Sequence, residues 1–422
     1  MTKIEEMLAD LCPNGVEWKE LGEVCELKNG YTPSKSNKEF WENGTIPWFR
    51  LEDIRKKGRI LSNSLQHISK TAVKGGKIFP ANSLIISTTA TIGEVALITV
   101  PFLCNQQITA VIKKENYEKN LDIKYLFYYL QILSNDMKKG INEGSFPIIS
   151  LSKMKGFKIP IPPLEIQQEI VALLDKFTEY VTELTAELTD RQKQYSFYRD
   201  KLLSFEDEVY QVEWKTLGEV ATFNYGYTDK ASDEGEIRFI RITDIDENGY
   251  LKEVDKKYIS ASSEAEKYLV KNGDILMART GATFGKTLFI KSDEKLVYAS
   301  FLIKITPNKE LNPRYYWHFS KSDLYWKQAN NLVSKAGQPQ FNANSLKKVK
   351  IPIPPLHIQQ RIVQVLDNFD TVCNDLNIGL PKEIEQRQKQ YEYFRDKLLT
   401  FTAEGVYPGQ WTVDSGQWAG TV

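Results

Sequence analysis

The chain has 422 residues, of which 41% are hydrophobic and 26% are charged, a composition typical of an ordinary soluble globular protein. Lys+Arg and Asp+Glu both number 55. No excess of positive charge therefore indicates a nucleic-acid partner, although a basic face can be balanced by acidic residues elsewhere. No stretch approaches the roughly 20 apolar residues that a membrane helix needs.

The cysteine pattern and the N-terminal segment bear on the compartment. Cys12, Cys25, Cys104 and Cys373 are scattered and form no Cys-x-x-Cys pair, and only three histidines are present. We therefore expect no structural zinc site and a reducing environment. Residues 1–10 lack the apolar core of a signal peptide, so we expect a cytoplasmic protein.

The sequence repeats itself over long distances. Residues 158–164, Lys-Ile-Pro-Ile-Pro-Pro-Leu, return letter for letter at 350–356. Further motifs recur with them: Val-Glu-Trp-Lys and Leu-Gly-Glu-Val within 16–24 and 212–220, and Arg-Gln-Lys-Gln-Tyr at 191–195 and 387–391. A two-unit repeat of this length suggests a molecule with two similar binding ends.

In chain order, the first predicted element is a block over residues 1–157. Short β-like runs such as 84–87 are separated there by Gly, Asn and Ser turns. The block over 209–349 has matching runs, for example at 273–277. The two blocks share a skeleton but differ in most letters. We predict two similar α+β domains, each with a mixed β-sheet and short helices.

A long helix is predicted after each proline-rich motif, within residues 158–208 and 350–404. In the first, apolar and aromatic residues are spaced alternately four and three positions apart, at Ile170, Leu174, Phe177, Val181, Leu184 and Leu188. This is the seam of a coiled coil. A helix over 164–205 would be roughly 60 Å long. It cannot bury its apolar stripe alone, so we expect the second helix to pack against it in antiparallel orientation.

The second helix is longer and is expected to be interrupted. Counted from Ile159 and Ile351, the Arg-Gln-Lys-Gln-Tyr motif begins after 32 positions in the first copy and 36 in the second. Gly and Pro near 379–381 should break the helix there. A tail at 405–422, with two Gly-Gln-Trp sequences, has no counterpart in the first copy.

These features together resemble the specificity subunit of type I DNA restriction-modification enzymes, over nearly the whole chain. The resemblance is carried by the repeated Pro-rich motif with Gln167, Gln168 and Ile170 or Gln359, Gln360 and Ile362, and by Arg-Asp-Lys-Leu-Leu at 199–203 and 395–399.

The resemblance implies a division of labour. Residues 1–157 and 209–349 would be target-recognition domains that each read one half of a bipartite, asymmetric site in double-stranded DNA. The spacer helices would set the gap between the half-sites and dock two modification (methyltransferase) subunits and, through them, the motor-nuclease restriction subunits. It implies no catalysis, cofactor or metal on this chain, and S-adenosylmethionine, ATP and Mg on the partner subunits, which methylate adenine and cleave DNA.

The nearest approach to an enzymatic motif is Gly-Ala-Thr-Phe-Gly-Lys-Thr at 281–287. It has three residues between its glycines where a phosphate-binding loop has four, and its twin carries Glu94 in place of Lys286. We favour a structural turn, from which Lys286 and Arg279 can still reach DNA phosphates. The acidic residues Glu236, Asp244, Asp246 and Glu247 are not preserved as a set in the first block, which favours a solvated turn over a metal site.

We predict DNA contacts from loops that combine basic, amide and aromatic residues. Gly-Tyr-Thr, shared by both blocks, is equally well explained as a fold-defining turn, and Arg50 and Arg241 equally well by internal salt bridges. Gln338 and Gln340 have the chemistry to pair with adenine edges. The predicted residues are Lys28, Asn29, Tyr31, Thr32, Lys35, Lys38, Arg50, Thr89, Ser145, Tyr225, Tyr227, Thr228, Lys230, Arg241, Arg279, Thr280, Lys286, Gln338 and Gln340.

Two other classes of function stay open on the residues alone. One is a two-headed scaffold whose blocks bind protein or glycan instead of DNA. The other is an autonomous enzyme. Salt-dependent DNA binding by the complex with its modification subunits distinguishes the DNA-recognition hypothesis from both.

Overall fold

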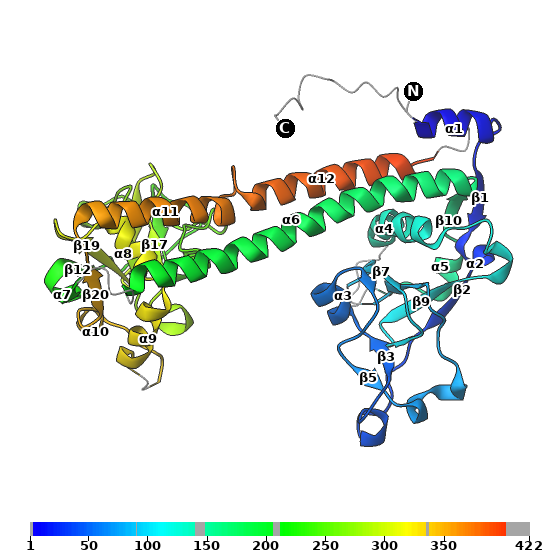
Figure 1. Ribbon diagram of the computed structural model, residues 1–422, viewed down its shortest axis with the longest axis horizontal. Coiled ribbons are helices and arrows are strands. Elements are labelled where there is room, and N and C mark those ends of the chain that lie inside the picture. Colours follow the sequence, from blue (N-terminus) through cyan, green and yellow to red (C-terminus); the bar gives the residue numbers. More distant parts are fainter. Residues whose placement is uncertain (1–2, 90, 140–147, 206–211, 335–336, 402–422) are drawn as a thin grey trace. The chain divides into compact units, whose positions relative to one another are not determined.

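A computed structural model describes the chain except residues 1–2, 90, 140–147, 206–211, 335–336 and 402–422. It divides into two compact units, Met1–Val181 with Arg387–Val422, and Thr182–Gln386. Figure 1 labels the elements of both. Each unit holds one of the repeated blocks together with parts of the long helices. Among the described residues no helix is long and apolar enough to cross a membrane.

The first unit contains a five-stranded sheet in the order β2-β9-β6-β7-β4, a three-stranded sheet β5-β3-β8 and a β1-β10 pair. Its elements are α1 (Lys3–Leu11), β1 (Glu17–Glu20), α2 (Leu21–Val24), β2 (Cys25–Asn29), β3 (Ile46–Phe49), α3 (Leu51–Lys57), β4 (Ile60–Leu61), β5 (His67–Ile68), β6 (Ser83–Ser87), β7 (Val95–Ile98), β8 (Leu103–Cys104), β9 (Ile108–Lys113), α4 (Ile123–Lys139), α5 (Leu151–Lys155) and β10 (Lys158–Ile161).

The second unit repeats this plan with two four-stranded sheets, β12-β19-β16-β17 and β14-β13-β18-β15, and a β11-β20 pair. Its elements are β11 (Glu213–Thr216), α7 (Leu217–Val220), β12 (Ala221–Tyr225), β13 (Ile237–Ile240), β14 (Tyr258–Ile259), β15 (Leu269–Val270), β16 (Ile275–Ala278), β17 (Thr287–Phe289), β18 (Leu296–Tyr298), β19 (Leu302–Pro307), α8 (Pro313–Phe319), α9 (Asp323–Leu332), α10 (Ala343–Leu346) and β20 (Lys350–Ile353).

The repeated motifs of the sequence pair with each other in space. In the first unit the strand with Val-Glu-Trp-Lys runs antiparallel to the proline motif, with Trp18 opposite Pro160. In the second unit Trp214 lies opposite Pro352 in the same register. Each pair is an isolated two-stranded ribbon, so the prolines need not donate to a further strand. The two motifs recur together because each is the other's hydrogen-bonding partner.

Three helices join the blocks: α6 (Leu164–Ser204), α11 (Leu356–Asn374) and α12 (Leu380–Leu399). With 41 residues, α6 is about 60 Å long. Phe177 stacks on Phe394 in the first unit, and Tyr195 and Tyr198 stack on Phe369 in the second. Residues later in α6 therefore contact residues earlier in the partner helices, so these helices run antiparallel to α6. This confirms the predicted antiparallel, α+β architecture.

The gap between α11 and α12 contains a glycine whose place no other residue could fill. A Cβ at Gly379 would lie 2.5 Å from the Thr371 carbonyl oxygen and 2.7 Å from that of Asp375. The Gly379 amide donates to Asp375 at 3.0 Å. Pro381 is then the second residue of α12, where its missing N–H costs nothing. The chain thus folds back over the end of α11 before the helix resumes.

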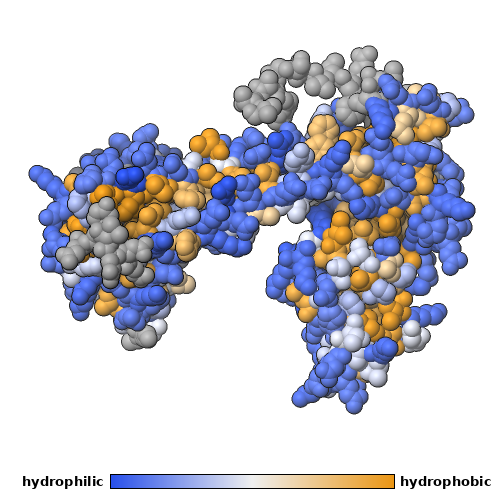
Figure 2. All heavy atoms as spheres, in the orientation of Figure 1, coloured by the Kyte–Doolittle hydropathy of each residue, from blue (hydrophilic) through white to orange (hydrophobic). Residues whose placement is uncertain are grey.

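Apolar side chains gather in separate cores within the units. In the first unit, one cluster joins Leu84 of β6 and Leu130 of α4 with Ile170 of α6 and Leu398 of α12. In the second, Met277 of β16 and Trp317 of α8 belong to a cluster with Leu366 of α11. Figure 2 shows hydrophilic residues over most of the visible surface, with apolar residues in smaller patches on both units.

A buried glutamine fastens each domain to its helix. Gln167 accepts from the Asp122 amide and donates to the Asn120 and Pro162 carbonyls, at 2.7–2.8 Å. Gln359 makes the same three contacts, accepting from Asn312 and donating to Glu310 and Pro354, each at 2.8 Å. Both glutamines are fully buried. Each satisfies three backbone groups at the point where the proline motif, the α6 or α11 helix and the preceding loop meet.

A second polar contact lies eight residues, about two turns, further along each helix. In the first unit, Lys124 and Tyr128 of α4 bind the two oxygens of Asp175, at 2.6 and 2.7 Å. In the second, Arg314 and His318 of α8 bind Asp367, at 2.7 and 2.8 Å.

In each unit a tyrosine from a second long helix, α12 in the first and α6 in the second, makes a further contact with the domain. Tyr391 of α12 donates to Gln131 in the first unit. Tyr195 of α6 reaches the His318 ring at 3.0 Å in the second. Because a carboxylate only accepts, the His318 Nε2 carries the proton towards Asp367, and Nδ1 accepts from Tyr195. Each domain is therefore held by both long helices.

We expect the buried glutamines to contribute strongly to stability. Replacing Gln359 by Met leaves one amide and two carbonyls without partners, and should lower the free energy of unfolding by roughly 3 kcal/mol or more. The neighbouring Gln360 is exposed, so Gln360→Met is a matched control expected to change stability by no more than about 0.5 kcal/mol. Urea denaturation measures both. Equal effects of the two substitutions would show that the buried hydrogen bonds are unimportant.

Acid should weaken the second unit through His318. Burial lowers the pKa of His318 from 6.5 to about 4, with Asp367 opposing and Arg314 and Lys321 adding to the effect. The unfolded chain therefore binds more protons between these two values, and stability decreases as pH falls through this window. The loss should reach roughly 3 kcal/mol. We expect urea unfolding of His318→Gln to lack this component. An identical pH dependence in the two proteins would contradict it.

Candidate nucleic-acid interface

An arginine enclosed by aromatic rings lies at one sheet edge of the second unit. Tyr225 ends β12, Arg279 follows β16, and Phe301 precedes β19, the strand that pairs with both. The Arg279 guanidinium is 5.3 Å from the Tyr225 ring and 5.4 Å from the Phe301 ring. Its Nε donates to the Ser300 carbonyl at 3.0 Å. Tyr225 and Phe301 are nevertheless 45% and 52% exposed.

The segment before α10 runs beside the same edge. The Phe341 amide donates to the Arg279 carbonyl at 2.8 Å, and the Gly281 amide donates to Pro339 at 3.1 Å. Thr280 forms a β-bridge with Gln340, whose side chain is exposed. The structure thus brings together five predicted residues from distant parts of the chain, namely Tyr225, Arg279, Thr280, Gln338 and Gln340.

A polar cleft of about 670 Å³ opens in the first unit. The Arg50 guanidinium lies 5.7 Å from the Trp48 ring, and its buried Nε has no hydrogen-bond partner in the part of the chain that the structure describes. The Thr32 hydroxyl donates to Gln106 at the rim. The lining combines cationic, amide and indole groups: Thr32, Lys35, Lys38, Trp41, Glu42, Trp48, Arg50, Gln66, Asn105 and Gln106. Four predicted residues, Thr32, Lys35, Lys38 and Arg50, meet here.

Arg241, the counterpart of Arg50, has a different environment. Its Nε and terminal nitrogen bind both oxygens of Asp244, at 3.2 and 2.7 Å, and it also reaches Asp255 at 3.2 Å. These hydrogen bonds, that to Asp244 foremost, raise the pKa of Arg241. Of the two alternatives for this pair of arginines, Arg241 therefore forms an internal salt bridge. Arg50 lines the cleft instead, and among the described residues its one ion pair is with Glu52, at 3.2 Å.

The Gly-Tyr-Thr motif has a structural explanation in both units. A Cβ at Gly30 would lie 2.2 Å from the Cys104 carbonyl oxygen, and one at Gly226 would lie 2.3 Å from that of Ala299. Tyr31 donates to the Ala72 carbonyl at 2.9 Å, and Tyr227 packs on Tyr268. The shared letters keep the backbone close to a neighbouring strand.

The other predicted residues lie away from these two surfaces, are already bound to other residues of the chain, or are exposed without further support for a DNA contact. Lys28 pairs with Glu26 at 2.8 Å, and Asn29 accepts from Thr109 at 2.8 Å. Thr89 forms a β-bridge with Ile148, as Thr280 does with Gln340. Thr228 and Lys230 are exposed. Ser145 lies outside the described residues.

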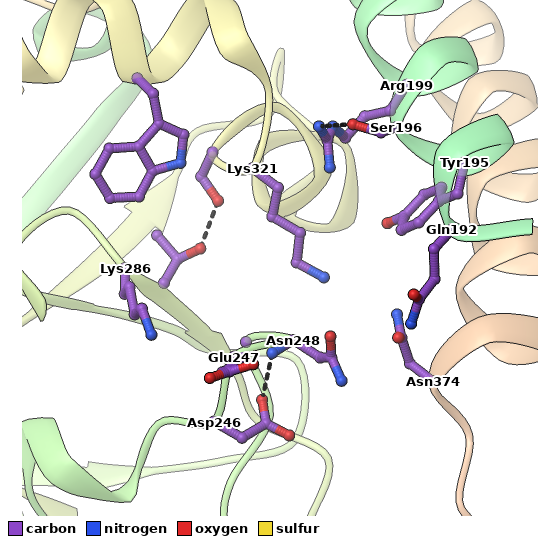
Figure 3. Close-up of a pocket in the computed structure, with 14 residues that line it drawn as sticks. Gln192, Tyr195, Ser196, Arg199, Asp246, Glu247, Asn248, Lys286, Lys321 and Asn374 are labelled. Atoms are coloured by element: carbon purple, nitrogen blue, oxygen red, sulfur yellow. Dashed lines mark hydrogen bonds between the residues drawn. The ribbon is translucent and has the colours of Figure 1, made fainter. Parts of the chain in front are cut away.

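Lys286 lines a separate pocket of about 350 Å³ (Figure 3). It lies on the same side of the pocket as Asp246 and Glu247, while Gln192 and Arg199 enter from α6 on the other side. Burial lowers the pKa of Lys321, which also points into this space, to about 7. Lysines balanced by acidic groups make this pocket less suited to a polyanion than the cleft at Arg50.

The motifs that resemble enzyme sites have structural roles. Residues 281–283 form a single 3₁₀ turn, and Gly285 after it has a φ of 79°, as Gly93 has one of 89° in the twin. Asp246 accepts the Asn248 and Tyr250 amides of its own turn. No cluster of three or more potential metal ligands occurs among the described residues.

Several functional candidates carry no signal in the sequence. Phe301, Trp41, Gln66, Asn105 and Gln106 belong to no repeated motif. They reach the two surfaces through strand pairing between distant segments. A search for aromatic residues that flank strands on the same predicted edge could have found Phe301, but only with the strand order known.

Comparison with known proteins agrees with this architecture. The family described as type I restriction modification DNA specificity domain matches residues 13–192 and 211–386. The Escherichia coli type I restriction enzyme EcoprrI specificity subunit is 40% identical over 377 residues, covering 86% of this chain and 89% of that protein. A putative type I restriction enzyme specificity subunit of Haemophilus influenzae, S.HindORF215P, is 32% identical over 403 residues, covering 92% and 96%.

A solved structure supports the fold at lower identity. A chain from work on complex assembly and conformational transition of the type I R-M system aligns with a TM-score of 0.61 and 20% identity, over 92% of this chain and 98% of that one. The family model matches two segments, the relatives align over most of the chain, and the fold is shared. These findings agree. The chain belongs to the family of type I restriction-modification DNA specificity subunits.

Proposed function

We propose that this subunit reads a bipartite, asymmetric site in double-stranded DNA, with one half-site recognised by each domain. The proposal rests on a contrast: the buried glutamine contacts between each domain and its helix are the same in both units, whereas the candidate DNA-binding surfaces differ. The glutamine contacts at Gln167 and Gln359 are equivalent. The surfaces differ at matching places: Arg50 lines a cleft whereas Arg241 binds Asp244, and the first domain has Thr88 where the second has Arg279. Base-edge readout requires surfaces that vary on a constant scaffold.

The two surfaces also have the chemistry that DNA recognition uses. Protonated guanidinium and ammonium groups neutralise phosphates and pair with guanine, and side-chain amides pair with adenine. The first domain supplies Lys35, Lys38 and Arg50 beside amides, and the second supplies Arg279 beside Gln338 and Gln340. Because Arg241 is occupied by Asp244 and Asp255, we assign it a structural role and leave it out of the interface.

The long helices act as spacer and dock in this proposal. Residues 158–208 and 350–404 would separate the recognition domains 1–157 and 209–349, with an interruption near 379–381 and a tail at 405–422. Two methyltransferase subunits would bind the helices and carry S-adenosylmethionine. Motor-nuclease subunits would bind through them and use ATP and Mg. The chain itself would catalyse nothing, because the chemistry resides on these partners.

Methylation mapping tests the function. Cells that carry this gene and its modification partners should show adenine methylation at one bipartite motif, which disappears when this gene alone is deleted. The purified complex should bind a duplex with that motif tightly and with an affinity that decreases steeply with salt. A complex that bound all duplexes equally, or bound protein or glycan instead, would refute DNA recognition.

Helix length should set the distance between the half-sites. Residues 181–184 and 185–188, Val-Thr-Glu-Leu and Thr-Ala-Glu-Leu, resemble a four-residue repeat in the exposed part of α6. A further Thr-Ala-Glu-Leu after Leu188 lengthens the helix by about 6 Å, roughly one to two base-pair rises. We expect methylation mapping to show a longer spacer with both half-sites unchanged.

A matched control keeps the helix length constant. Replacing residues 185–188 with a second Val-Thr-Glu-Leu alters the composition but should leave the spacer unchanged. Altered half-sites with an unchanged spacer in the insertion variant would contradict the role of the helices as a ruler.

A further inference from the structure

We propose that Arg279 reads a guanine in the half-site bound by the second domain, through the terminal nitrogens of its guanidinium. This inference rests on the proposed function and names the residue and the base that carry part of its specificity. It follows from how Arg279 is held and from which of its donors are left free.

The side chain is fixed on three sides. Its Nε donates to the Ser300 carbonyl at 3.0 Å, and the Tyr225 and Phe301 rings lie 5.3 and 5.4 Å from the guanidinium. The Tyr225 ring is itself anchored, because its hydroxyl accepts the Ala343 amide at 3.2 Å. A guanidinium held in this way has already lost much of the rotamer freedom that binding would otherwise cost.

The backbone around Arg279 is fixed as well. Its amide donates to the Phe301 carbonyl at 3.0 Å, and its carbonyl accepts from Phe341 at 2.8 Å. Arg279 is thus joined on one side to the segment before β19 and on the other to the segment before α10. Neither neighbour can shift without breaking a sheet-like contact.

The terminal nitrogens of Arg279 have no protein partner among the described residues. The two buried arginines of this unit differ from the half-buried Arg279: Arg238 binds Glu253 and Glu294, and Arg314 binds Asp367 and Asp370. With Nε turned inward to Ser300, the edge with the two terminal nitrogens is the free one. An arginine held by aromatic rings, without a carboxylate and at a solvent-exposed edge, is a donor prepared for an external acceptor.

Guanine fits this donor better than a phosphate does. Guanine presents O6 and N7 side by side in the major groove, and two parallel N–H groups of one arginine match them. The groups beside Arg279 are the kind that meet base edges rather than phosphates. They are the exposed Gln340 amide and the rings of Tyr225 and Phe301, whose apolar edges can contact a thymine methyl.

The first domain cannot make the same contact. At the matching place after β6 it has Thr88, which is buried and whose amide donates to the Gln107 carbonyl as the Arg279 amide donates to Phe301. Arg279 therefore belongs to the part of the repeat that has diverged. Its contact should affect one half-site only.

Three variants of the full chain, each in complex with its modification subunits, test the assignment. Arg279→Lys keeps the charge and removes the planar fork, and Arg279→Ala removes both. Lys271→Ala removes one charge from an exposed position of the same unit and is the matched control. The second half-site is identified independently by exchanging residues 209–349 for those of a relative and observing which half of the motif changes.

We expect both Arg279 variants to lose discrimination at one guanine of that half-site, with the other half-site and the spacer unchanged. Wild-type affinity should fall roughly 10- to 100-fold when 7-deazaguanine, which lacks N7, replaces that guanine. The Arg279→Ala complex should bind the two duplexes equally. Lys271→Ala should keep the wild-type motif and the wild-type response to 7-deazaguanine.

Other outcomes overturn the assignment. A uniform loss of affinity with an unchanged motif and a shallower salt dependence would make Arg279 a phosphate contact. Wild-type behaviour of the variants, or a second half-site without guanine, would exclude the contact. Retained recognition of the first half-site shows that a variant is folded. A wild-type complex with no sequence preference would refute the proposed function instead.

Discussion

The geometry of each unit depends on one buried side chain, the first glutamine after the proline-rich motif. Gln167 and Gln359 each join three backbone groups from separate segments of the chain. A buried amide with three well-formed hydrogen bonds tolerates little displacement, because any shift exposes an unpaired donor or acceptor to an apolar core. The position of each domain on its helix is therefore set by hydrogen-bond geometry, and the apolar contacts add strength around it.

Beyond the buried glutamine, the two units use different side chains for equivalent contacts between the domain and the long helices. Tyr128 and His318 occupy equivalent places. Tyr128 of α4 lies between Asp175 of α6 and Tyr391 of α12, and His318 of α8 lies between Asp367 of α11 and Tyr195 of α6. One junction contains the Lys124–Asp175 ion pair, and the other contains a buried cluster with Arg314 and Asp370. Different chemistry thus maintains the same arrangement. This explains how the recognition surfaces can change without altering the frame that presents them.

The sequence predicted the frame more completely than the interface, and the reason lies in the range of the interactions. Helix pattern, proline motif and the break near Gly379 are local, so the spacing of residues indicates them. Local pattern did not reveal that Gln359 is buried while Gln360 is exposed. Nor did it separate Arg50 from Arg241, since the decisive partners, Asp244 and Asp255, matter only once the loops fold. The stack around Arg279 depends on the register of three strands.

The contribution of α12 to the first unit has a consequence for the order in which the protein can form. Tyr391, Leu398 and Leu399 belong to the same core as Leu84 and Ile170. The second unit is a continuous stretch of chain, Thr182–Gln386. During synthesis, which begins at the N-terminus, the second unit has all its segments before the first one does. The core of the first unit must wait, with part of its apolar surface uncovered, until α12 has left the ribosome.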